Sequence, residues 1–95
     1  MFDGLPSVEL LESTHHFPCQ YTFKAIGIDE EHFVGRVLEA VKSTLVESAE
    51  PSFSCRSTSS GKHICVTVEP DVAHAEHVVE IYMRLQQVKG LVMLL

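Results

Sequence analysis

The chain has 95 residues, 45% of them apolar, and a formal net charge of −6. That length suits one domain with a modest core. The excess of 13 acidic over seven basic residues argues against a nucleic-acid backbone as partner. No apolar run reaches the roughly 18 residues that a membrane span needs. Residues 1–6 also lack the basic and apolar regions of a signal peptide, so we expect a cytoplasmic protein.

The N-terminal part divides into a lead and a first strand. Residues 1–14 mix apolar and acidic side chains and are expected to be poorly ordered, leaving a single domain over residues 15–95. Residues 17–27 alternate between two faces, which predicts a strand that ends at Gly27. One face carries Phe17, Cys19, Tyr21, Phe23 and Ala25, and the other carries Gln20, Thr22 and Lys24.

An amphipathic helix is predicted next. Asp29 is expected to cap it, with Glu30 and Glu31 in the first turn, where acidic side chains are favourable. The residues at helical spacing that form its apolar face are Phe33, Val34, Val37, Leu38, Val41 and Leu45. This pattern predicts about four turns, and Pro51 follows where the next strand begins.

Residues 52–69 read as a hairpin. Apolar residues alternate along both halves, and a two-residue loop at Ser60-Gly61 would pair Ser59 with Lys62. The facing pairs in this register are Phe53–Val68, Cys55–Val66 and Ser57–Ile64. A slip by one residue would scatter the apolar side chains over both faces. Gly61 supplies the positive φ that a tight turn needs, and the opposite faces of Cys55 and Cys65 predict free thiols.

A second helix and a final strand complete the pattern. Asp71 is expected to cap the helix, Glu80 and Arg84 have the spacing of an i, i+4 ion pair, and Gly90 ends the helix. The predicted core stripe of this helix is Ala75, Val78, Val79, Tyr82 and Leu85. Residues 91–95 follow as a fourth strand that is apolar on both faces.

The order strand, helix, strand, strand, helix, strand predicts an α+β ferredoxin-like βαββαβ sandwich. Its four-stranded antiparallel sheet should carry both helices on one face, with the first and third strands in the centre. The open face is expected to be polar, with Gln20, Thr22, Lys24, Arg56, Thr58, His63, Cys65 and Thr67. The apolar C-terminal strand should be covered by a second copy of the chain, giving a homodimer, or by residues 1–14.

Several segments resemble the YbeD-like family of small bacterial proteins. The specific matches are Tyr21-Thr22-Phe23-Lys24 and the turn Ser59-Ser60-Gly61; the similarity covers about residues 10–95. The resemblance implies a ferredoxin-like fold similar to the ACT regulatory domains of amino-acid-metabolism enzymes. It implies no catalytic residue.

Known activities of this fold find little support in the residues. The open face lacks the aromatic side chains with which RNA-recognition motifs stack bases. His74, His77 and Glu80 have metal-ligand spacing, but a solvated helix face is the favoured interpretation, so no metal or cofactor is expected. Cys65 beside Arg56 could be a reactive thiol, against the favoured interpretation as a structural one. We therefore expect no catalytic residues and no enzyme.

Two function classes remain. The first is a regulatory or interaction module that binds a protein, or itself, through Arg56, His63, Cys65, Leu91, Met93 and Leu95. The alternative is an ACT-like sensor of a small metabolite, with the contacts Gly27, Ile28 and Asp29 at a helix start. The acidic residues at that helix start favour an amine-bearing ligand such as an amino acid.

Overall fold

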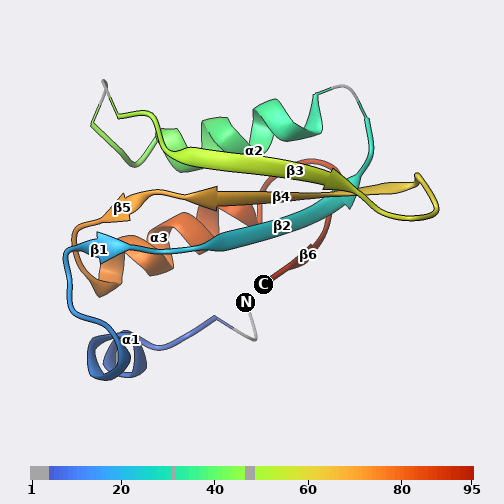
Figure 1. Cartoon of the computed structure of the whole chain (residues 1–95). Helices are drawn as coiled ribbons and strands as arrows, with labels where there is room; N and C mark the ends of the chain where they lie inside the picture. Colours follow the sequence, from blue (N-terminus) through green and yellow to red (C-terminus); the bar gives the residue numbers. More distant parts are fainter. Residues whose placement is uncertain (1–4, 31, 47–48) are drawn as a thin grey trace.

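The computed structural model describes residues 5–30, 32–46 and 49–95. Its main body is an antiparallel sheet of four strands in the order β3-β4-β2-β6, with helices α2 and α3 against one face (Figure 1). The elements are α1 (Val8–Thr14), β1 (Cys19–Gln20), β2 (Phe23–Ile28), α2 (Phe33–Lys42), β3 (Ser52–Ser57), β4 (His63–Glu69), β5 (Asp71–Val72), α3 (Ala75–Leu85) and β6 (Leu91–Leu94). The predicted α+β fold and strand order are confirmed.

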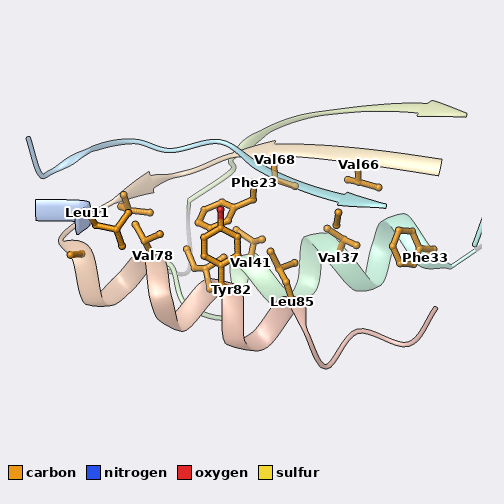
Figure 2. Close-up of a cluster of buried hydrophobic side chains, with 14 residues drawn as sticks. Leu11, Phe23, Phe33, Val37, Val41, Val66, Val68, Val78, Tyr82 and Leu85 are labelled. Carbon is orange, nitrogen blue, oxygen red and sulfur yellow. The ribbon is translucent and has the colours of Figure 1, made fainter. Parts of the chain in front are cut away.

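The core lies between the helices and the central strands β2 and β4 (Figure 2). Its largest fully buried side chains include Phe23, Phe33, Leu11, Ile81 and Leu85. Ile81, absent from the predicted stripe of α3, is fully buried. In the described parts of the chain, no helix combines the length and apolar character needed to cross a membrane.

The predicted first strand is two strands. β1 pairs with β5 in a separate two-stranded sheet, whereas β2 lies in the main sheet. Pro70, between β4 and β5, has no N–H to donate and so interrupts the long strand there. Its carbonyl oxygen accepts a hydrogen bond of 3.0 Å from the N–H of Tyr21, between β1 and β2. Gly27 lies inside β2, which continues to Ile28.

The predicted helix caps are wrong. Helix α2 begins at Phe33, and its N-cap residue His32 makes no side-chain capping bond. Asp29 instead accepts a hydrogen bond of 3.0 Å from the Ser57 hydroxyl. Asp71 lies in β5. Helix α3 is capped by Nδ1 of His74, which accepts a hydrogen bond of 3.2 Å from the N–H of His77.

Helix α2 has ten residues, about three turns where four were predicted. Helix α3 ends at Leu85, five residues before Gly90, which lies in the following turn with a φ of 94°. Glu80 and Arg84 form the predicted ion pair, at 3.2 Å. The predicted position of Glu31 in the first turn lies outside the described residues.

The hairpin has the predicted register, and Gly61 has the predicted positive φ, 75°. Its loop is longer than predicted, because the paired strands end at Ser57 and Ile64 and the pair Ser59–Lys62 is not formed in the described ladder. The N–H of Gly61 donates to the carbonyl oxygen of Thr58 at 2.9 Å and closes the turn.

Strand β3 is exposed along its whole length, although alternation predicted a half-buried strand. Phe53, on the side of the sheet that faces the helices, is 52% exposed. Helix α2 packs on the central strands β2 and β4, and α3 packs on β6 at the opposite edge, so β3 is left without cover.

Residues 8–14, within the predicted lead, form α1, which packs against α3. The hydroxyl of Ser7 caps this helix by accepting a hydrogen bond of 3.1 Å from the N–H of Leu10. Leu11 reaches the core and is 2% exposed. Burial of this leucine holds the short helix to the domain.

Candidate functional site

The face of the sheet opposite the helices carries side chains of mixed character. Successive strand residues alternate between faces, and the register aligns the strands across the sheet. This open face carries Lys24, Ile26 and Ile28 from β2, His63, Cys65, Thr67 and Glu69 from β4, Ser52, Ser54 and Arg56 from β3, and Met93 from β6. The prediction of a polar open face is therefore wrong along β2, at Ile26 and Ile28, whereas the apolar character of β6 was expected.

An apolar stripe, defined here as Ile26, Ile28, Met93 and Leu95, crosses that side of the open face. Ile26 lies opposite Met93 in the pairing of β2 with β6. Leu95 continues β6, because its N–H donates to the Lys24 carbonyl oxygen at 2.8 Å and its own carbonyl oxygen accepts from Lys24 at 3.2 Å. Ile28, Met93 and Leu95 are 48%, 51% and 59% exposed, so their side chains remain available for contact.

A basic hollow of about 380 Å³ lies beside the stripe, over β4. It is lined by Lys24, Ser54, Cys55, Arg56, Cys65 and Thr67. Lys24 stands opposite Thr67, and Arg56 stands opposite Cys65, so the two cations flank β4 from the strands on either side. Among the described residues neither cation has a carboxylate partner, whereas Arg36 pairs with Glu30 and Arg84 pairs with Glu80.

The predicted interaction residues fall on this surface with one exception. Arg56, His63, Cys65, Met93 and Leu95 share the open face. Leu91 lies opposite Gly27 on the face that packs against the helices, and it is half-buried. Ile26 and Ile28 were missed, although the alternation that placed Lys24 on this face continues through both of them.

The predicted sensor residues lie at one end of the sheet. The N–H of Ile28 donates to the carbonyl oxygen of Gly90 at 3.0 Å, and the N–H of Asp29 donates to that of Lys62 at 3.1 Å. Gly27 is buried against the ring of Phe33. Both N–H groups are therefore hydrogen-bonded within the fold. Through these two bonds, residues 28–29 connect the hairpin to the turn before β6.

A groove of about 750 Å³ runs between α2 and α3 near this loop. Its lining consists of His32, Gly35, Arg36, Glu39, Ala40, Ser43, Arg84, Gln87, Val88 and Lys89. Arg36 connects its two sides, since it pairs with Glu30 and its Nε donates to the carbonyl oxygen of Lys89 at 3.1 Å. The hydrogen bond from Arg36 lowers the pKa of the Glu30 carboxyl.

His77, one of the three residues with metal-ligand spacing, has both ring nitrogens engaged. Its Nδ1 accepts a hydrogen bond of 3.1 Å from the N–H of Ala73, and its Nε2 lies 3.0 Å from the hydroxyl of Thr44. That hydroxyl donates to the carbonyl oxygen of Val41, so the proton between the two side chains belongs to Nε2. Burial lowers the pKa of His77, which keeps this ring neutral.

The three cysteines are free, as predicted. Although Cys55 lies on the exposed strand β3, partial desolvation of its thiol, with a smaller effect of the nearby Cys65 thiol, raises the pKa of Cys55 above its usual value. A raised pKa lowers the fraction of thiolate, the nucleophilic form, at neutral pH.

These features define a small α+β domain of ferredoxin-like topology with an exposed open sheet face. The chain belongs to the DUF493 family, described as protein of unknown function, whose model matches residues 12–95. This membership confirms the YbeD-like resemblance.

Bacterial relatives match along most of the chain. A UPF0250 protein of Photorhabdus laumondii is 31% identical over 77 residues, which cover 81% of this chain and 82% of the relative. A UPF0250 protein of Shewanella oneidensis is 28% identical over 82 residues, or 86% of each chain. The solution structure of protein HP0495 from H. pylori is similar in fold, with a TM-score of 0.62, 16% identity and coverage of 98% of both chains.

Proposed function

We propose that this chain is a non-catalytic, regulatory interaction module that binds a protein partner through its open sheet face and the adjoining β6 edge. The observation that carries the proposal is the apolar stripe, in which three large side chains about half exposed lie together. Contiguous exposed apolar side chains with polar neighbours are typical of protein-binding surfaces. Free cysteines support a reducing compartment such as the cytoplasm.

The chemistry of the titratable side chains supports a role without catalysis. The ring of His77 is neutral and held by two hydrogen bonds. The raised pKa of Cys55 works against a nucleophilic thiolate. Among the described residues, no group of three or more His, Cys, Asp or Glu side chains is placed to hold a metal ion.

A second copy of the chain is the partner that the β6 edge suits best. The side chains of residues 91–95 carry no charge, and proteins usually protect an exposed edge strand with charged residues or proline. Lys24 and Leu95 exchange both of their backbone hydrogen bonds. In an antiparallel pair the adjacent residue then points its backbone groups the other way, so the N–H and C=O of Leu94 are directed away from β2. Those groups can pair with another β6.

The test of the module is capture of partners by the full chain and by matched variants. Ile28→Glu and Met93→Glu place a charge on the apolar stripe, and Met83→Glu places the same charge on α3, at a methionine that is 55% exposed. We expect a partner captured by the wild type and by Met83→Glu, and lost with both stripe variants. Equal capture by all four chains would disprove the proposal.

The metabolite sensor is the second candidate, and the groove between α2 and α3 is the observation that favours it. The groove has room for an amino acid, and its lining includes Arg36, which pairs with Glu30, the residue after Asp29. A thermal-shift screen of the amino acids tests this candidate. A saturable stabilisation that Asp29→Asn weakens would support it. If no amino acid raises the melting temperature of the protein, the metabolite-sensor candidate is eliminated.

A further inference from the structure

We propose that the basic hollow between Lys24 and Arg56 binds a carboxylate of an acidic, apolar segment of the partner protein. The inference rests on the proposed function and names the chemistry of the partner. The carboxylate would lie in the hollow, and neighbouring apolar side chains of the same segment would cover the apolar stripe.

The first argument is the distribution of charge. The chain is acidic, and the other two arginines and Lys42 each have a carboxylate partner. Among the described residues Arg56 and Lys24 have none; the same holds for Lys62 and Lys89, but those two lysines do not line the hollow. Glu69 lies next to the hollow on β4 and accepts a hydrogen bond from the Thr22 hydroxyl. The two cations outnumber this carboxylate and give the hollow a positive potential that an incoming carboxylate would neutralise.

The second argument is the set of donors. The arginine guanidinium can bind both oxygens of a carboxylate in parallel, and the lysine ammonium adds a third charged donor. The hydroxyls of Ser54 and Thr67 line the same hollow and can donate as well. β2 and β3 are two strand spacings apart, about 10 Å, so long side chains from both can approach a carboxylate above β4.

The third argument separates a peptide from a small carboxylate. The hollow adjoins the apolar stripe through Ile26, which lies beside Cys65 on one side and Met93 on the other. A small metabolite in the hollow would leave Ile28, Met93 and Leu95 exposed to water, whereas a peptide segment can cover them. The open face of a second copy is a poor occupant, because it would oppose cations with cations.

The experiment compares two short synthetic amphipathic peptides with the same leucine positions. One carries glutamate and the other carries lysine at every polar position. Each is titrated into the full chain labelled with ¹⁵N, and amide shifts are followed by NMR. We expect the glutamate peptide to shift Lys24, Arg56, Cys65 and the apolar stripe, with affinity that falls as salt rises. The lysine peptide should bind at least about tenfold more weakly.

Charge reversal supplies the matched control. The double variant Lys24→Glu/Arg56→Glu should invert the preference, so that the lysine peptide binds the more tightly. The double variant Lys62→Glu/Lys89→Glu makes the same change in net charge at lysines outside the hollow, and should keep the preference for the glutamate peptide. Equal affinity for both peptides, or the same change in both double variants, would overturn the inference.

Two further outcomes are decisive. If citrate alone produces the same shifts as the glutamate peptide at equal affinity, the hollow binds small carboxylates and the peptide assignment is wrong. In the capture experiment, loss of a partner with Met93→Glu but not with Lys24→Glu/Arg56→Glu would overturn the carboxylate inference while leaving the interaction module intact.

Discussion

The ring of Phe33 occupies the space in which a side chain at Gly27 would begin. A β-carbon built on Gly27 overlaps that ring and lies 2.7 Å from the carbonyl oxygen of Gly90. Three segments, β2, the first turn of α2 and the turn before β6, therefore meet at a position that has no room for a side chain. The contact fixes how closely α2 approaches the sheet.

Gly27→Ala should destabilise the fold by about 1–3 kcal/mol, because Phe33 is fully buried and both it and the Gly90 backbone would have to move. Gly35→Ala is the matched control. A β-carbon there meets nothing within 4 Å, and alanine favours a helix over glycine by about 1 kcal/mol, so that variant should be more stable than the wild type. Urea unfolding measures both, and equal stabilities would contradict the packing described for Gly27.

His77 should make the protein less stable in mild acid. Burial lowers its folded-state pKa, Glu80 raises it by less, and His74 and the hydrogen bond with Thr44 have smaller effects. The unfolded chain, with a pKa of about 6.5, thus binds a proton more readily than the folded one. The stability contributed by the neutral ring is present above about pH 6.5 and is lost as the pH falls below it.

The measurement for this histidine is urea unfolding at about pH 7.5 and about pH 5. His77→Gln should reduce the difference in the free energy of unfolding between the two pH values. His16→Gln, at an exposed position, should leave that difference unchanged. An equal pH dependence in all three proteins would show that His77 is not the group responsible.

Tyr82 should make the protein less stable at alkaline pH. Burial, followed by the Tyr21 hydroxyl at 3.5 Å, raises the pKa of Tyr82 well above its usual value. Stability is therefore full below about pH 10, the unfolded pKa, and declines as the pH rises beyond it, because only the unfolded chain readily loses the proton. Tyr82→Phe should flatten that decline in thermal unfolding; an unchanged slope would contradict it.

Association of two copies should depend on β6. Light scattering of the wild type should give a mass that rises from one chain towards two with concentration. Met93→Lys should stay at one chain, because it introduces a strongly hydrated charge beside the paired edge. Met83→Lys, an equal change on α3, should associate like the wild type. A wild type that remains a single chain at high concentration would refute the β6 pairing.

The hairpin shows what the sequence could predict. Alternation from Phe53 to Val68 and the position of Gly61 were independent signals, and together they identified the register of the hairpin. The edge position of β3 was predicted from the order of the elements along the chain. Both signals are local. Whether Phe53 is buried depends on where the helices end above the sheet, which no pattern within the strand records.

The candidate site was predictable in part. Arg56 and Cys65 were paired from the hairpin alone, and the structure places them opposite each other. Ile26 and Ile28 carried the same alternation signal but were not predicted to lie on the open face. Ile26 lay within the predicted strand, whereas Ile28 lay beyond its predicted end at Gly27 and was assigned to the sensor contacts instead. Asp29 has the usual chemistry of a cap, yet its carboxylate accepts from Ser57, a residue of β3 that is 28 positions away in the sequence.

The two edges of the sheet differ in character. β3 has three serines and Arg56 among its six residues, whereas β6 is wholly apolar. Pairing through β6 would bury the apolar edge of the described four-stranded sheet and leave polar β3 strands at both ends of an eight-stranded sheet. Assembly by edge pairing would therefore terminate at two subunits, which protects an aggregation-prone strand without opening a route to fibres.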